Sequence, residues 1–100
     1  MRIAFAADDE NDTTRAVLDL LARRGDEMVS LPPAAEASTA EAAAAWPDLG
    51  AAVGRAVVEG AADVGIVMCW TGTGTAIAAN KVPGVRAALA WDPWIARGAR

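Results

Sequence analysis

Residues 63–86, DVGIVMCWTGTGTAIAANKVPGVR, decide the fold of this chain. An apolar run over 64–68 leads into Cys69, the single cysteine. A turn rich in glycine and threonine follows, then small residues that predict a helix over 73–81, and then a second apolar run over 85–90. The pattern predicts a strand–loop–helix–strand unit with a thiol at the carboxyl end of its first strand, where open α/β sheets bind ligands. Loop and helix N–H groups at that edge suit an anion.

The rest of the chain repeats this alternation of apolar strands and helices. Further strands are predicted over residues 2–6 and 27–31. Helices are predicted over 13–24, from Trp46-Pro47-Asp48 to Gly60, and from residue 92 onward. The alanine-rich stretch 32–45 lacks large core residues and predicts a surface loop. Strands that alternate with helices imply a parallel sheet with right-handed crossovers, so we expect one α/β domain over residues 1–100.

Signals at both ends support the predicted helix over 13–24. Asn11 or Asp12 can cap its first turn, and two arginines lie in its last turn, where positive charge suits the helix dipole. Gly25 follows, and glycine readily adopts the left-handed conformation that ends many helices.

A strand order of 2-1-3-4 brings two distant loops to one crevice. In this order the chain reverses direction between the first and third strands, so the loops over 7–9 and 69–74 flank the same place on the sheet edge. Asp8 and Cys69 then become neighbours although 61 positions separate them in the sequence.

Composition limits the classes of function. The 100 residues are 54% hydrophobic, which is typical of a globular chain. The net charge of −4 argues against a nucleic-acid partner, which requires a basic surface stripe. The single cysteine excludes an internal disulfide, and the lack of histidine disfavours a zinc site. The sequence contains neither a signal peptide nor a long apolar run, so we expect a cytoplasmic protein with no membrane partner.

Cys69 has two interpretations. Free cysteines are among the most buried residue types, so an inert buried thiol is one of them. The other is a thiolate that acts as base or nucleophile, since a strand end beside a helix N-terminus favours the ionised form of a thiol.

The loop Thr71-Gly72-Thr73-Gly74-Thr75 matches neither common phosphate-binding motif. It lacks the spacing of a P-loop, and a dinucleotide fingerprint needs Gly or Ala where Ile77 stands. A tight turn that requires a positive φ accounts for its glycines equally well.

Other side chains near the predicted crevice also have two interpretations. Asp8 and Asp9 are either loop or capping carboxylates or substrate contacts, and Asn80 either bridges backbone groups or lies beside the substrate. Trp70 lies inside the predicted site. The other three tryptophans are expected to serve packing or an interface: Trp46, Trp91 and Trp94.

These motifs in combination resemble the ribose-5-phosphate isomerase B / galactose-6-phosphate isomerase family, and the resemblance covers nearly the whole chain. It rests on the strand that ends in Asp8, the aromatic-Pro-Asp helix start over 46–48, and Cys-x-Thr-Gly-x-Gly over 69–74. The resemblance also rests on the stretch that follows over 77–88, Ile-Ala-Ala-Asn-Lys-Val-x-Gly-Val-Arg-Ala-Ala.

The resemblance implies a Rossmann-like three-layer α/β/α sandwich that forms a homodimer or higher homo-oligomer with active sites between subunits. It implies aldose–ketose isomerisation of a sugar phosphate through a cis-enediolate, without a metal or organic cofactor. By position, Cys69 would be the base, Thr71 would assist ring opening, and Asp8 would hold sugar hydroxyls. The backbone that would stabilise the enediolate oxygen belongs to Thr71, Gly72, Thr73 and Gly74. Asn80 would be a structural or substrate-adjacent position.

Departures from the family pattern leave other functions open. Asp9 stands where the family usually has histidine and would repel a phosphate, and Trp70 replaces a glycine and would reshape the pocket around the substrate. The chain stops at Arg100, before the family's His-Asn motif, further strand, long helix and phosphate-binding arginines, so we expect a truncated or reduced relative. The alternatives are an isomerase of a non-phosphorylated sugar and a non-catalytic small-molecule binding or assembly module on the same fold.

Overall fold

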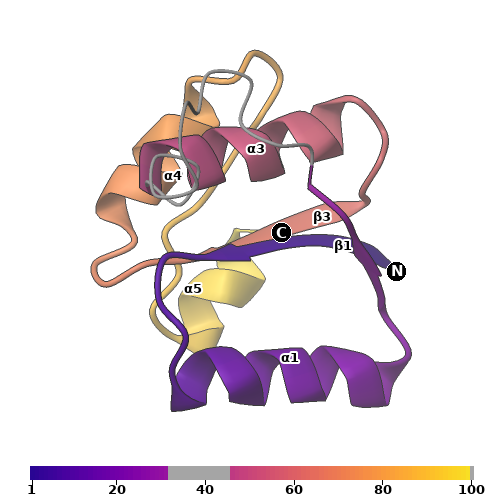
Figure 1. Ribbon diagram of the computed structural model, residues 1–100. Coiled ribbons are helices and arrows are strands. Elements are labelled where there is room, and N and C mark those ends of the chain that lie inside the picture. The colour runs from indigo at the N-terminus through magenta and orange to yellow at the C-terminus, as the bar shows by residue number, and fades with distance from the viewer. Residues whose placement is uncertain (32–45, 100) are drawn as a thin grey trace.

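A parallel sheet lies between two layers of helices in the computed structural model, which describes residues 1–31 and 46–99 (Figure 1). The strands are β1 (Arg2–Ala7), β2 (Glu27–Val29) and β3 (Val64–Met68), in the order β2-β1-β3. The helices are α1 (Asp12–Arg24), α3 (Trp46–Val58), α4 (Thr73–Asn80) and α5 (Pro93–Gly98). Helix α1 covers one face of the sheet, and α3 and α4 cover the other. The predicted three-layer architecture and the order 2-1-3 are confirmed, while the loop predicted over 32–45 lies outside the described residues.

Strand β1 is the centre of the sheet because its side chains are apolar on both faces. It pairs in parallel with β2 from Arg2 to Ala4 and with β3 from Ile3 to Ala7. Ile3 and Ala4 are almost completely buried, as expected of a strand covered by helices on both sides. No described helix is long and apolar enough to cross a membrane.

Both predicted ends of α1 are confirmed. Asn11 is the N-cap, and its side-chain oxygen accepts hydrogen bonds from the backbone N–H groups of Thr13 and Thr14, each at 3.0 Å. Gly25 has φ 76° and ends the helix in the left-handed conformation. The N-cap of α1 therefore lies two residues after Asp9, at the edge where ligands are expected.

Helix α3 packs on the sheet and on α4 through small residues. Val53 of α3 sits over Gly65 of β3, where a Cβ atom would collide with it. A Cβ on Gly50 would lie 2.6 Å from the carbonyl oxygen of Thr75 in α4. Because both contacts need glycine, they bring the two helices and the sheet close together and fix where α4 begins.

The fourth strand predicted over 85–90 is wrong: these residues pair with no described strand, so the order ends at 2-1-3. The side-chain amide of Asn80 instead donates to the carbonyl of Ala87 at 2.8 Å and accepts from its N–H at 2.9 Å. Val85 packs against Gly54 of α3, and Leu89 lies over Gly72. Exposure still alternates along the segment, so it is extended, but helix contacts replace a strand partner.

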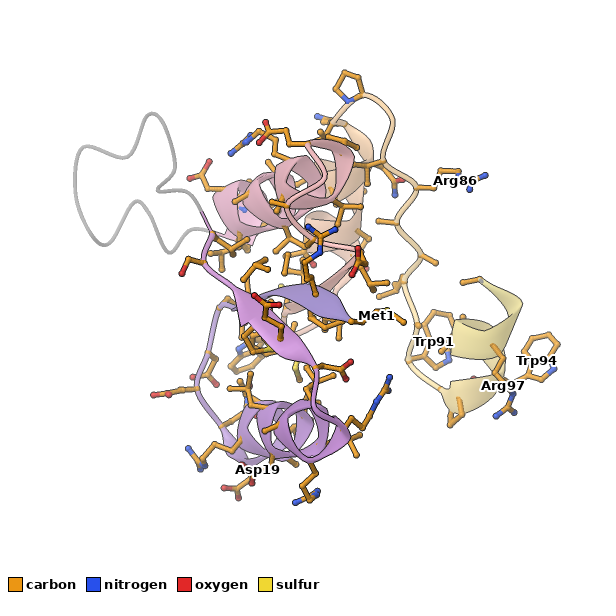
Figure 2. The ribbon with its side chains drawn as sticks, turned by 90° about the vertical axis from the view of Figure 1, so that its right-hand side faces the viewer. Met1, Asp19, Arg86, Trp91, Trp94 and Arg97 are labelled. Atoms are coloured by element: carbon orange, nitrogen blue, oxygen red, sulfur yellow. The ribbon has the colours of Figure 1, made fainter. Side chains whose placement is uncertain are left out.

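The tryptophans differ in packing. The ring of Trp46 lies over Gly74 at the start of α4, which confirms its packing role. Trp94 points away from the rest of the molecule at α5 (Figure 2), and the exposed fractions of Trp91 and Trp94 are 75% and 76%. The packing role predicted for Trp91 and Trp94 is therefore wrong within the described residues. A role at an interface stays a prediction for both.

Candidate functional site

The loops after β1 and β3 leave the sheet side by side. The last pair of the β1–β3 register is Ala7 with Met68, and the N–H of Asp8 donates to the carbonyl of Met68 at 3.2 Å. Asp8 and Cys69 therefore follow directly after paired positions. Their predicted juxtaposition is confirmed, since it depends only on the pairing of strands one and three.

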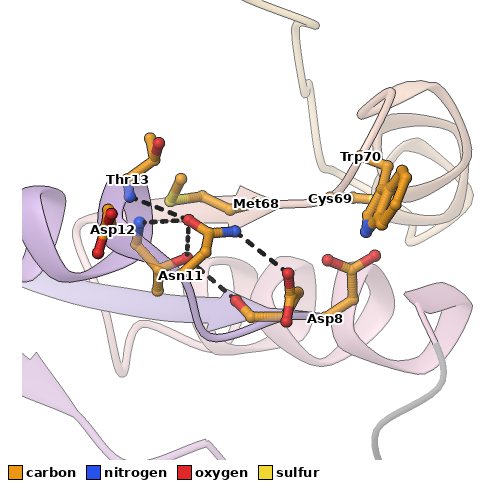
Figure 3. Close-up of a pocket in the computed structure, with 9 residues that line it drawn as sticks. Asp8, Asn11, Asp12, Thr13, Met68, Cys69 and Trp70 are labelled. Carbon is orange, nitrogen blue, oxygen red and sulfur yellow. Dashed lines mark hydrogen bonds between the residues drawn. The ribbon is translucent and has the colours of Figure 1, made fainter.

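A pocket of about 520 Å³ opens at this edge (Figure 3). Its walls come from the β1–α1 loop, the first turn of α1 and the end of β3. The lining residues are Asp8, Asp9, Asn11, Asp12, Thr13, Thr14, Met68, Cys69 and Trp70. Four of the predicted site residues thus meet in one cavity: Asp8, Asp9, Cys69 and Trp70.

Cys69 and Trp70 form the β3 side of the pocket. Cys69 is a free cysteine and is half-buried, so it does not lie in the core, and its role as a base stays a prediction. The Trp70 side chain is 89% exposed, and the Asp8 carboxylate turns toward its indole ring (Figure 3). A thiol, a carboxylate and an aromatic face are therefore all within reach of one small molecule.

Asp9 is held by the start of α1 from two directions. The amide nitrogen of Asn11 donates to the Asp9 carboxylate at 3.4 Å. The hydroxyl of Thr14, which is only 3% exposed, donates to the Asp9 carbonyl oxygen at 3.0 Å. These contacts keep the Asp9 carboxylate on the pocket wall.

The glycine–threonine loop does not line this pocket. Gly72 has φ 72°, and the Thr71 hydroxyl accepts from the N–H of Thr73 at 3.3 Å, so the prediction of a tight turn is confirmed. Four predicted site residues of this loop do not line the pocket: Thr71, Gly72, Thr73 and Gly74. Asn80 is also absent from it, and its amide is occupied by Ala76 and Ala87.

Residues 11–14 were missed as pocket residues by sequence reasoning, which considered Asn11 and Asp12 only as helix caps. The available signal was the short spacing from Asp9 to the capping position, since a helix that starts so soon after the strand must turn its first residues toward the crevice. The carboxylate of Asp12 pairs with Arg15. No lysine or arginine lines the pocket among the described residues.

Known proteins resemble both the sequence and the fold. A family model described as Ribose/Galactose Isomerase matches residues 3–100. A solved structure, ribose-5-phosphate isomerase B of Clostridium thermocellum, is 37% identical, with a TM-score of 0.80 over 100% of this chain and 65% of that chain.

Two curated relatives match a shorter stretch. Galactose-6-phosphate isomerase subunit LacB of Clostridium acetobutylicum is 46% identical over 55 residues, which are 55% of this chain and 32% of the relative. Ribose-5-phosphate isomerase B of Escherichia coli is 42% identical over 55 residues, which are 55% of this chain and 37% of the relative. The matched stretch thus spans about a third of these curated relatives.

Proposed function

The chain belongs to the ribose/galactose isomerase family, and from this premise we propose that its pocket interconverts an aldose and a ketose by proton transfer through a cis-enediolate. The substrate class is a sugar or sugar phosphate, as the names of the relatives indicate. One observation carries the proposal: Cys69 lines the same cavity as Asp8. A base and a hydrogen-bond acceptor for substrate hydroxyls are two of the groups that this chemistry needs beside the substrate.

In the proposed mechanism the Cys69 thiolate removes the proton from C2 of the open-chain aldose. The electron pair moves into the C1–C2 bond, and the carbonyl electrons go to the C1 oxygen, which gives the enediolate. The proton of the C2 hydroxyl moves to the C1 oxygen, so the negative charge passes to the C2 oxygen. The thiol then returns its proton to C1, and the ketose carbonyl forms at C2 while C1 keeps the new hydroxyl. Asp8 accepts hydrogen bonds from substrate hydroxyls and fixes their orientation.

The loop that follows Trp70 is assigned to the oxyanion. Backbone N–H groups over 71–74 stand one to four residues beyond the pocket lining, at the start of α4, and such groups stabilise developing negative charge. Thr71 is assigned to ring opening. Asn80 acts as a positioning residue, because its amide holds the turn after α4.

Assembly and location complete the proposal. We assign a homodimer to the chain, because family resemblance implies it and Trp91 and Trp94 expose apolar surface that a partner would cover. The same resemblance to metabolic enzymes supports a cytoplasmic location.

Exchange of a carbon-bound proton with solvent tests the proposed chemistry. Aldoses and their phosphates are incubated with the protein in D₂O, and deuterium incorporation at C1 and C2 is followed by NMR. Cys69→Ala should lower the exchange rate by at least about a hundredfold, as expected when a general base is removed.

Glu10→Gln serves as the control, because Glu10 lies in the same loop but outside the pocket lining, and it should exchange like the wild type. Full exchange by Cys69→Ala would exclude the thiol as base. Saturable sugar binding without any exchange in the wild type would identify a binding module instead of an isomerase.

A further inference from the structure

We propose that this pocket receives the uncharged, hydroxyl-bearing end of the substrate, and that Asp9 and Trp70 set this preference against a phosphate group. The inference rests on the proposed isomerase function and deepens it by assigning the orientation of the substrate. A phosphate, where the substrate carries one, lies outside the pocket of Figure 3.

The charge of the pocket opposes an anion. Three carboxylates line it, from Asp8, Asp9 and Asp12, and no cationic side chain does so among residues 1–31 and 46–99. Arg15, the nearest arginine along α1, already pairs with Asp12. Asp8 and Asp9 have no described ion-pair partner, so a phosphate dianion in the pocket would face two uncompensated negative charges.

Two N–H groups at the helix end that borders the pocket already have a side-chain acceptor. Helix N-termini bind phosphate through their free backbone N–H groups. In α1 the N–H groups of Thr13 and Thr14 already donate to the side-chain oxygen of Asn11, and that of Arg15 donates to the Asn11 carbonyl. Asn11 therefore occupies the position that a phosphate oxygen would take.

The same groups suit a polyhydroxylated, uncharged ligand. Carboxylates accept hydrogen bonds from hydroxyl donors, and Asp9 is held in place for this by Asn11 and Thr14. The exposed indole of Trp70 offers an apolar face for the C–H groups of a sugar, while the Asp8 carboxylate lies on the same side. Carboxylates that accept hydrogen bonds from hydroxyls, beside an aromatic ring that contacts C–H groups, favour the hydroxyl-bearing end of a sugar over a phosphate.

A comparison of a sugar with its phosphate tests whether the pocket prefers the uncharged end of the substrate. The full chain is titrated with an aldopentose, its 5-phosphate and inorganic phosphate, and the backbone amides of residues 8–14 and 68–70 are followed by ¹⁵N NMR. The aldopentose should shift these amides, and inorganic phosphate should not. In water a dianion about 6 Å from one carboxylate loses about tenfold in affinity, so Asp9→Asn should raise the affinity for the 5-phosphate about tenfold relative to the sugar.

Two variants complete the design. Asp19→Asn makes the same change in net charge on an exposed position of α1 outside the pocket and should leave the affinity ratio unchanged (Figure 2). Trp70→Ala should weaken binding of the neutral sugar.

Inorganic phosphate that shifts the pocket amides of the wild type, an unchanged ratio in Asp9→Asn, or no shift with any ligand would each overturn the inference. Preferred exchange of the 5-phosphate, together with phosphate shifts in the pocket, would overturn the inference and leave the isomerase function standing. Sugar-selective pocket shifts without proton exchange would support the pocket assignment and reject isomerisation.

Discussion

Asn11 performs two tasks with one side chain. Its oxygen caps α1, and its nitrogen donates to the carboxylate of Asp9 on the pocket wall. Capping residues with a short polar side chain are common at helix starts because they satisfy N–H groups that have no helical partner. Here the second half of the same amide couples the start of the helix to the candidate site.

The capping role of Asn11 predicts a graded effect on stability. Asn11→Ala should lower the free energy of unfolding by about 1 kcal/mol, because the N–H groups of Thr13 and Thr14 lose their acceptor. Asn11→Ser keeps a capping oxygen and should remain within a few tenths of a kcal/mol of the wild type. Urea unfolding of both variants measures the difference, and equal losses in both would contradict the capping argument.

At the scale of elements, the interface of α3 and α4 depends on the absence of side chains. Gly50 of α3 approaches the backbone of α4 at Thr75, and Gly54 accepts Val85 from the extended segment after α4. Since α4 begins at Thr73, within the glycine–threonine stretch, this close packing helps to place the N–H groups over 71–74. Small residues in α3 therefore act on the candidate site through helix placement.

Gly50→Ala tests this packing against helix propensity. Alanine favours a helix over glycine by about 1 kcal/mol, yet the added Cβ would collide with the Thr75 carbonyl, so we expect a net loss of about 1–3 kcal/mol of stability. Gly98→Ala is the matched control, because a Cβ there meets nothing within 4 Å. Thermal unfolding compares the two, and a stabilised Gly50→Ala variant would show that α3 and α4 can separate without cost.

On the scale of the whole molecule, β1 links two opposite ends of the fold. Its carboxyl end borders the pocket, and its first residue, Arg2, forms an ion pair with Asp63 just before β3 at 2.6 Å. The N–H of Arg2 donates to the other Asp63 oxygen at 2.8 Å, and the guanidinium also reaches the Gly60 carbonyl at 2.8 Å. This group of contacts sets the start of the β1–β3 register, and the register in turn aligns Asp8 with Cys69.

The ion pair predicts a dependence of stability on pH. The side-chain hydrogen bond from Arg2, together with its backbone N–H, holds the pKa of Asp63 below its usual value. A carboxyl whose pKa is lowered by folding stabilises the native state above the unfolded pKa of about 3.9, and this contribution is lost as pH falls through the folded value. The difference in unfolding free energy between wild type and Asp63→Asn should therefore be largest above about pH 5 and shrink toward pH 2.

Urea unfolding at a series of pH values measures this difference. Asp19→Asn controls for the change in net charge, since Asp19 has no described ion-pair partner. A difference between wild type and Asp63→Asn that stays constant between pH 2 and pH 7 would contradict the role of the ion pair.

Local sequence patterns were enough to predict much of the fold. Helix α1 could be predicted with both ends, because Asn11 and Gly25 are signals that act within a few residues. The neighbourhood of Asp8 and Cys69 followed from strand order. In contrast, the path of 85–90 could not be predicted, because its apolar alternation suits either a strand partner or the contacts with Asn80 and Gly54 that the fold provides.

What the amino-acid sequence determined by itself is therefore the layer architecture, the two loops that meet at the sheet edge, and the described elements, although it also predicted a strand over 85–90 that does not form. Only the tertiary structure decided that the first turn of α1 lines the pocket, that the loop over 71–74 lies outside it, and that Asn80 holds Ala87. The physical reason is that helix caps and hydrophobic periodicity act over a few residues. The partners of Asn80 and the closeness of α3 to α4 depend instead on which distant backbone and side-chain groups the folded chain brings into contact.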